Sequence, residues 1–274
     1  MKKVISIILV CIIVTGIGIL LYPIISNSVN SYYNLSNIKK YNNNVKSLNN
    51  NEINNMLNKA IEYNNAVATS SYNNGIINYG EQYKKVISSY DNILNFENGI
   101  IGYIEIPRIK VYLPIYHGDL KDVLTKGAAH MKGTSFPIGG KGTHAVISAH
   151  SGYTQQKFFD DLDNLKRNDT FRITVLDKKL EYKVKKINIV KPSDTSHTKI
   201  KQNKDLVTLV TCYPYGINSH RLLVTGERQY NNDISNKSVI QKNNDIKISY
   251  KISFIPIVLL FSYILIFIYR VKRK

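Results

Sequence analysis

The stretch that decides the fold is residues 208–212, Thr-Leu-Val-Thr-Cys, a β-branched apolar run that ends on Cys212. Nine residues later Arg221 opens a second apolar run, 222–225, after a short loop that contains Pro, Gly and Asn. This pattern predicts two strands joined by one loop, which brings a thiol and a guanidinium to neighbouring strand ends. A nearby cation favours the thiolate, the reactive form of cysteine, so Cys212 is a candidate nucleophile.

More short apolar runs lie upstream of this pair and are separated by Gly and Pro turns. The predicted strands are Gly102–Ile106, Val111–Ile115, His144–His150, Phe171–Leu176, Leu180–Ile189, Val207–Cys212 and Arg221–Gly226. Many short strands at close intervals are typical of a mainly β sandwich or barrel. A short helix is predicted near Lys157–Leu162, between two of the strands.

A cysteine nucleophile needs a proton-managing partner, because a free thiol with a pKa of about 8.5 is mostly protonated at neutral pH. His150 ends a buried apolar strand, where its side chain can face a groove. His220 is the alternative, next to Arg221. Adjacent residues of a strand point to opposite faces, so His220 points away from Cys212 if Arg221 points toward it. Both histidines stay open on this reasoning.

Two other histidines fit the site less well. His144 begins the strand that His150 ends, so the two lie roughly 20 Å apart at about 3.3 Å per residue. His117 precedes Gly118 in a turn, which favours a surface role.

Arg221 carries a planar fork of donors that keeps its charge and can hold a carbonyl oxygen or a developing oxyanion. The simpler interpretation is an ordinary salt bridge with Glu227 or Asp205. No Cys/His pair has metal-ligand spacing, and the glycine-rich residues 139–143 lack the frame of a phosphate-binding loop. We therefore expect neither a metal nor a cofactor.

Composition narrows the function classes. The 274 residues suffice for one or two domains, and the only cysteines are Cys11 and Cys212. Cys11 lies in an apolar segment, so the two do not pair, and Cys212 is either a reactive thiol or a small buried apolar residue. The net charge of +18 would suit an anionic partner. However, the lysines are scattered rather than clustered with aromatic residues, which argues against nucleic-acid binding.

Two apolar segments frame the chain. Residues 4–25 contain no charge and follow Lys2 and Lys3, and residues 252–269 precede the basic tail 270–274. About 20 apolar residues span a bilayer, and positive flanks mark the cytoplasmic side. An uncleaved anchor is favoured over a signal peptide, because no Ala-x-Ala cleavage pattern follows the first segment. The pattern predicts two transmembrane helices with both termini cytoplasmic.

The region between the first apolar segment and the strands is rich in Asn, Ser and Tyr. Helical spacing of apolar residues predicts one amphipathic helix over roughly Asn51–Ala66. The stretch Ala68–Gly80 has no clear period and is predicted to be a loop, and residues 229–251 are predicted to be a polar tether.

Residues 208–228 as a whole resemble the signature of sortases, and their continuation after Cys212 is similar to class C, the pilin-polymerising group. Three upstream segments, Gly102–Pro107, Leu113–Gly118 and Gly133–Gly140, match the same family. The resemblance covers about residues 99–228. It implies a closed eight-stranded β-barrel with short helices, an N-terminal helical extension and two transmembrane helices.

The resemblance also implies roles for single residues. Cys212 would be the nucleophile, His150 the general acid/base and Arg221 the group that stabilises the oxyanion and substrate, whereas His220 would have no catalytic role. The implied reaction cleaves an LPxTG-like sorting signal through a thioester and transfers it to an amine, typically a pilin lysine. Class C enzymes usually carry an Asp-Pro-aromatic lid. Residues 68–80 lack that tripeptide, and only Tyr72 could supply an aromatic plug.

The expected division of the chain follows from these segments. It comprises 1–3 cytoplasmic, 4–25 transmembrane, 26–98 helical or loop extension, 99–228 catalytic barrel, 229–251 tether, 252–269 transmembrane and 270–274 cytoplasmic tail. Three alternatives to pilus assembly remain: transfer of surface proteins to a cell-wall precursor, a non-enzymatic wall-binding module, and a simple cysteine peptidase. The expected partners are proteins with sorting signals, an amine acceptor and the membrane, but not nucleic acid.

Overall fold

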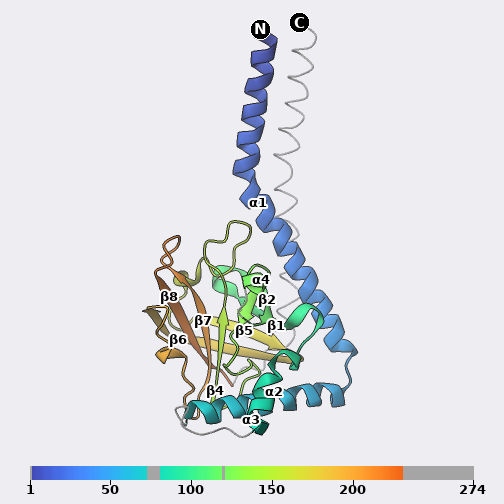
Figure 1. The fold of residues 1–274 in the computed structure, drawn as a ribbon, viewed down its shortest axis with the longest axis vertical. Coiled ribbons are helices and arrows are strands. Elements are labelled where there is room, and N and C mark those ends of the chain that lie inside the picture. Colours follow the sequence, from blue (N-terminus) through green and yellow to red (C-terminus); the bar gives the residue numbers. More distant parts are fainter. Residues whose placement is uncertain (1, 73–80, 119–120, 231–274) are drawn as a thin grey trace. The chain divides into compact units, whose positions relative to one another are not determined.

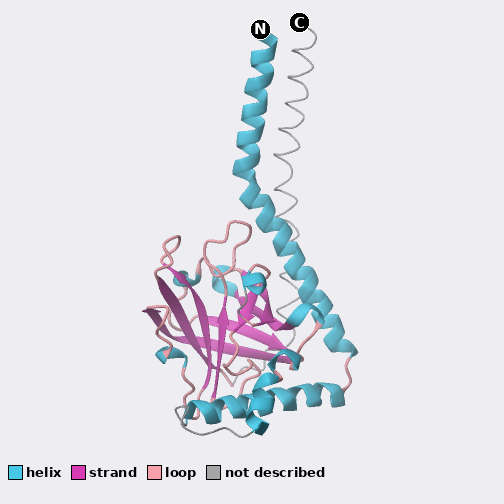
Figure 2. Ribbon diagram, in the orientation of Figure 1, coloured by secondary structure: helices cyan, strands magenta, loops and turns pink. Residues whose placement is uncertain are grey.

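The computed structural model describes residues 2–72, 81–118 and 121–230 (Figure 1). Eight strands close into one barrel in the order β1-β2-β3-β4-β7-β8-β6-β5, drawn in magenta in Figure 2. They are β1 (Ile100–Ile106), β2 (Val111–His117), β3 (Ala128–His130), β4 (Thr143–Ser148), β5 (Thr170–Val175), β6 (Lys178–Val190), β7 (Asp205–Tyr213) and β8 (His220–Arg228). The predicted eight-stranded barrel is thereby confirmed.

Helices precede the barrel and interrupt its connections. The α-helices are α1 (Lys2–Ser47), α2 (Asn50–Tyr72), α3 (Glu81–Ser88) and α4 (Lys121–Leu124). The 3₁₀-helices are η1 (Tyr90–Asn92), η2 (Glu97–Gly99), η3 (Pro107–Ile109), η4 (Leu162–Asn164) and η5 (Ser196–Thr198). The helix predicted near 157–162 was wrong over most of its length, because residues 157–161 are irregular and only the 3₁₀-helix η4 follows them.

Strand β3 was not predicted from the sequence. It has three residues, and Gly127 stands directly before it. A run this short gives no periodicity, so its pairing with β2 and β4 decides its conformation. Gly127 also allows close packing here, because a β-carbon at that position would lie 2.7 Å from the carbonyl oxygen of Pro114.

Helix α1 continues well beyond the predicted apolar segment. The described residues contain one helix long and apolar enough to cross a membrane, and this helix runs on to Ser47. Its last turns bury Ile38, Tyr41 and Val45, a spacing of three and four residues that keeps one face on the core. This packing outweighs the weak helix propensity of the asparagines between them. The segment predicted at 252–269 and the tether beyond Tyr230 lie outside the described residues.

The apolar part of α1 and the barrel fall into two compact units. The first contains residues 1–31 and 154–156, and within it Ser26 and Asn30 both donate hydrogen bonds to the carbonyl of Gln155, at 2.8 and 2.9 Å. The second contains residues 32–153 and 157–232 and holds the whole barrel.

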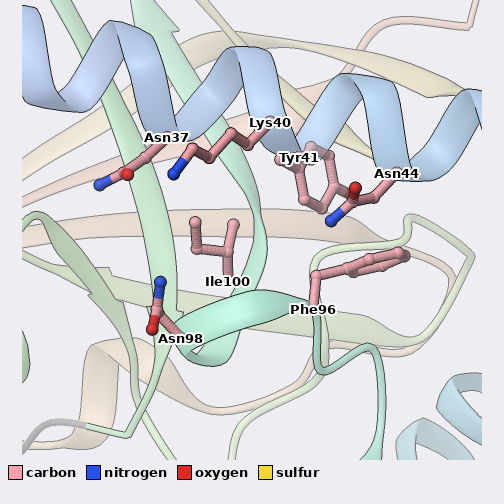
Figure 3. A pocket seen from close by; sticks show the side chains of 7 residues that line it. All are labelled: Asn37, Lys40, Tyr41, Asn44, Phe96, Asn98 and Ile100. Atoms are coloured by element: carbon pink, nitrogen blue, oxygen red, sulfur yellow. The ribbon is translucent and has the colours of Figure 1, made fainter.

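The C-terminal part of α1 packs closely against the start of the barrel (Figure 3). The Tyr41 hydroxyl donates to the carbonyl of Ile101 at 3.0 Å and accepts from the amide of Leu176 at 2.7 Å. The space left beside Tyr41, between α1 and the Phe96–Ile100 segment, is about 10 Å³, room for about one water molecule. Hence α1 packs directly on the start of the barrel here, and the remaining space is too small for a ligand.

Helix α2 is longer than predicted at its C-terminal end. Residues 68–72 are helical, so the loop predicted from Ala68 was wrong up to Tyr72, and 73–80 lie outside the described residues. The N-terminus has a reciprocal capping box: Asn49 Oδ1 accepts from the amide of Glu52, and Glu52 Oε2 accepts from that of Asn49. A buried stripe holds the helix on the barrel, comprising Leu57, Ala60, Tyr63, Asn64 and Val67.

Candidate active site

Cys212 and Arg221 face each other across the β7–β8 hairpin. The two residues are direct partners in the antiparallel register. Side chains of directly opposed residues lie on the same face, with β-carbons about 4.5–5.5 Å apart. The thiol is half-buried, which leaves it within reach of solvent. The structure therefore brings the predicted nucleophile and the predicted cation together.

His150 reaches the same region from the neighbouring strand. Strands β4 and β7 are parallel, and Ser148 pairs with Val210. The ladder continues by one residue, because the amide of Ala149 donates to Val210 at 3.1 Å and the Thr211 hydroxyl donates to the Ala149 carbonyl at 2.8 Å. If the same register is extended two residues past Ser148 and Val210, residue 150 comes level with residue 212 on the adjacent strand.

The imidazole of His150 is held by its own loop. Its ring stacks on Tyr153, with centroids 5.5 Å apart and planes 11° from parallel. Its carbonyl accepts a hydrogen bond from the amide of Phe159 at 2.9 Å. Burial lowers the pKa of His150, and the nearby carboxylate of Asp160 opposes that shift. The ring is therefore neutral at neutral pH and suited to accept a proton.

Arg221 bends back over its own loop. Its Nη1 donates to the carbonyls of Asn218 at 3.1 Å and His220 at 2.9 Å. The alternative salt bridges are not formed in the described part of the chain, since Glu227 pairs with Lys204 and Asp205 accepts hydrogen bonds from Tyr182 and Gly140. The guanidinium is therefore anchored at one nitrogen and keeps other donors for a ligand.

The other histidines have separate environments. His220 is opposite Tyr213, and its Nδ1 contacts the Ser219 hydroxyl at 2.9 Å. His144 is buried and contacts Thr208 Oγ1 at 2.7 Å and the Lys199 carbonyl at 2.9 Å.

His117 was wrongly expected to have a surface role. It is half-buried, and its two ring nitrogens contact the carbonyls of Gly99 at 3.0 Å and Ile93 at 2.6 Å. Burial lowers its pKa.

Sequence reasoning missed three residues that shape the site. Tyr153 stacks on the imidazole, Asp160 folds the histidine loop, and Tyr215 lies over the backbone of Gly152. Asp160 accepts from the amides of Gly152 at 3.0 Å and Phe158 at 2.8 Å. The one available signal was the glycine two residues after His150, which marks a turn that another group can approach closely.

A larger hollow lies at the other end of the same strands. It measures about 330 Å³ and is lined in part by Lys178, Asp205, Arg228 and Tyr230. Asp205 begins β7, so this hollow is separate from Cys212 near the strand's other end.

Comparisons with known proteins agree with this geometry. Residues 104–229 match the model of the sortase domain. The chain is 31% identical over 130 residues to sortase D of Bacillus subtilis (strain 168), covering 46% of this chain and 63% of that protein. It is 30% identical over 128 residues to sortase A of Bacillus anthracis, covering 47% and 59%. The matches thus span less than two thirds of these relatives.

Solved structures match over a larger share of their length. The structure of Clostridium perfringens sortase C with the C-terminal cell wall sorting motif is 40% identical, with a TM-score of 0.60, covering 71% of this chain and 98% of that one. Sortase C1 of Streptococcus agalactiae is 38% identical, with a TM-score of 0.64, covering 72% and 100%. The similarity therefore includes the helical extension as well as the barrel.

Proposed function

The chain belongs to the sortase family, and we propose that it is a membrane-anchored cysteine transpeptidase of class C that joins pilin subunits. The observation that carries this proposal is the register that sets Cys212 opposite Arg221 and brings His150 level with both. Similarity to class C structures, at 40% and 38% identity, supports the pilin-type acceptor.

In the proposed first step, the Cys212 sulfur attacks the threonine carbonyl of an LPxTG-like signal. His150 takes the thiol proton, the C–S bond forms, and the negative charge passes to the carbonyl oxygen. Arg221 holds that oxyanion with its remaining donors, a contact that strengthens in the transition state. The C–N bond to glycine then breaks, and His150 returns its proton to the departing amine.

In the second step, an acceptor amine attacks the thioester. His150 removes a proton from the amine, the C–N bond forms, and the C–S bond breaks to release Cys212. A pilin lysine is the proposed acceptor, and a cell-wall precursor amine is the alternative. A histidine at this place can serve both steps, because a neutral imidazole accepts a proton and the imidazolium so formed donates it again.

The deciding experiment mixes the full chain, in detergent, with a sorting-signal peptide and then with a lysine-bearing pilin. Mass spectrometry should detect a thioester on Cys212 and then an isopeptide product. Cys212→Ala should abolish both, whereas Cys11→Ala is the matched control and should keep both. Absence of an adduct with the unmodified chain would contradict the enzymatic proposal, and water as the sole acceptor would identify a peptidase.

We also propose how the chain sits at the membrane. The apolar part of α1 would span the bilayer with Lys2 and Lys3 on the cytoplasmic side, and residues 252–269 would form a second span. Both termini would then be cytoplasmic and the barrel extracellular, where substrates with sorting signals are exported.

A further inference from the structure

The loop between Cys212 and Arg221 carries two large exposed side chains with different surroundings. Tyr215 is 66% exposed and Ile217 is 73% exposed. A single exposed apolar side chain is ordinary. Tyr215 differs because its ring lies against the backbone of Gly152. Its Cε2, Cζ and Oη atoms lie 3.4, 3.5 and 3.8 Å from the position that a β-carbon on Gly152 would take.

This contact joins the two loops that carry the reactive groups. Gly152 is the second residue after His150, and Tyr215 is the third residue after Cys212. Gly152 has φ +79°, a conformation that strains residues with a side chain, and its amide donates to Asp160 at 3.0 Å. The positive φ is what favours glycine at this turn, because a β-carbon here would make only ordinary van der Waals contact with the tyrosine ring.

Each loop is fixed on its own side of the contact. In the cysteine loop, the amides of Ile217 and Asn218 both donate to the Pro214 carbonyl, at 3.1 and 2.9 Å. In the histidine loop, Phe159 bonds the His150 carbonyl, and Tyr153 stacks on the imidazole. Movement at the Tyr215–Gly152 contact would therefore shift one loop against the other rather than deform either one.

We propose that Tyr215 is a positioning residue that couples the Cys212 loop to the His150 loop and so sets the separation of sulfur and imidazole. The proposal rests on the transpeptidase chemistry proposed above, in which the imidazole removes the thiol proton. Such transfer depends steeply on geometry, and a misplacement of about 1 Å can cost roughly 100-fold in rate. Among the described residues, Asp160 and Tyr153 are the titratable groups that act on His150 from its own loop; Cys212 lies on the adjacent strand β7, and Arg221 lies opposite Cys212 on β8.

The test compares Tyr215→Ala with Ile217→Ala, a change in the same loop at a more exposed residue. Both variants are made in the full chain with Cys11→Ala, so that Cys212 is the only thiol. Two measurements are made in detergent: the pH profile of Cys212 alkylation by iodoacetamide without substrate, and kcat and KM for sorting-signal cleavage. Melting temperatures verify that each variant is folded.

We expect Tyr215→Ala to lower kcat by at least about 10-fold, a fraction of the loss from a full 1 Å displacement. It should also slow alkylation at neutral pH and move its pH midpoint upward, because the thiol loses its proton acceptor. Ile217→Ala should change neither, and Tyr215→Phe should stay close to the unmodified chain because it keeps the contacting ring carbons.

Two outcomes would overturn the coupling. Identical alkylation profiles for Tyr215→Ala and Ile217→Ala would show that Tyr215 does not act on the thiol–imidazole pair. A rise in KM alone, with alkylation unchanged, would make Tyr215 a substrate contact instead. Failure of the proposed function is recognised separately: the chain with Tyr215 intact would then form no thioester, while its alkylation profile would still report on the coupling.

Discussion

At the scale of single residues, Arg221 illustrates why a positive charge alone is not enough to stabilise an oxyanion. Its Nη1 is anchored on two loop carbonyls, so the rest of the fork is aimed by the protein before a substrate arrives. Lysine keeps the positive charge but has a single side-chain nitrogen. It therefore cannot bond the loop carbonyls through one nitrogen and the ligand through another. We expect Arg221→Lys to reduce kcat for thioester formation by roughly 100-fold, the scale of losing one oxyanion donor.

The measurement is single-turnover acylation of Cys212 by a sorting-signal peptide. The matched control is Arg228→Lys on the same strand, seven residues away, which should acylate normally. An Arg221→Lys enzyme with unchanged acylation would show that charge, rather than the fork, is what the reaction requires.

His130 provides a residue-scale prediction about pH. Burial lowers its pKa from 6.5 to about 4, while its Nε2 contacts the Ser135 carbonyl at 2.8 Å and its Nδ1 contacts the Tyr90 hydroxyl at 2.9 Å. Between those two pH values the unfolded chain binds a proton that the folded chain does not. The free energy of unfolding should therefore fall as pH decreases from 6.5 to 4, by about 3 kcal/mol from this residue.

Urea unfolding of the full chain between pH 7.5 and 4.5 measures this slope. His130→Gln keeps an N–H near Ser135 but cannot titrate, so its slope should be flatter than that of the unmodified chain. His117 and His144, whose pKa values are also lowered by burial, account for part of the remaining slope. Parallel slopes for the two proteins would refute the assignment to His130.

Among single residues, the sequence predicted the pairing of Cys212 and Arg221 better than the surroundings of His150. Two strands joined by one loop must place their facing ends together, so local pattern suffices for the first pair. Tyr153 and Asp160 act through the fold of an irregular loop, which has no period to detect. The environment of His117 depends on carbonyls of η2 and of the turn after η1, which no local pattern around His117 specifies.

At the scale of elements, a reciprocal pair of hydrogen bonds helps to hold α2 on the loop that follows β3. Asn64 Oδ1 accepts from the amide of Phe136 at 2.7 Å, and its Nδ2 donates to the Phe136 carbonyl at 3.1 Å. Asn64→Ala leaves a buried donor and acceptor unsatisfied, which should lower the free energy of unfolding by about 2–3 kcal/mol. Asn65→Ala, on the exposed side of α2, is the matched control and should stay within about 0.5 kcal/mol.

Urea unfolding monitored by circular dichroism distinguishes these two variants. Equal stabilities would mean that the buried apolar stripe of α2 holds the helix without help from Asn64. Since alanine is the better helix former, any small effect of Asn65→Ala should be stabilising.

The elements themselves differ in how far local sequence predicts them. The long strands were predicted almost throughout because apolar and β-branched residues recur along each of them. The ends of α1 and α2 were misjudged because asparagine-rich segments form helices here only through buried residues such as Tyr41 and Tyr63, which contact parts of the chain distant in sequence. Propensity is a weak guide where tertiary contacts supply the stabilisation.

At the scale of the whole molecule, the two cysteines report on the proposed membrane arrangement. Cys11 lies in the apolar part of α1 and Cys212 in the barrel. In native membranes opened to both faces, a charged maleimide should label one site per chain, at Cys212, because the bilayer shields Cys11. Cys212→Ala should then remain unlabelled, and detergent denaturation of the unmodified chain should raise the count to two. Labelling of Cys11 in intact membranes would contradict the anchor.

The order of strands in the closed barrel is the property that local sequence predicts least. Hydrophobic runs indicated many short strands, but sandwich and barrel remained equally compatible with them. Closure depends on pairs such as β1 with β5 and β6 with β8, which join segments separated along the chain. The resemblance of residues 99–228 to a known family implied a closed eight-stranded barrel, but not the order of its strands.

The ladder between β7 and β8 has a consequence for enzyme engineering. Backbone pairing places Cys212 opposite Arg221, so the exposed side chains of Ile217 and Ser219 in the connecting loop can vary. Gly216 (φ +79°) and Asn218 (φ +61°) form its left-handed turns and are kept. Libraries that randomise positions 217 and 219 while keeping Tyr215, Gly216 and Asn218 would explore new peptide preferences with the anchor of Arg221 retained. Selection from such libraries offers a route to ligases that splice chosen protein tags.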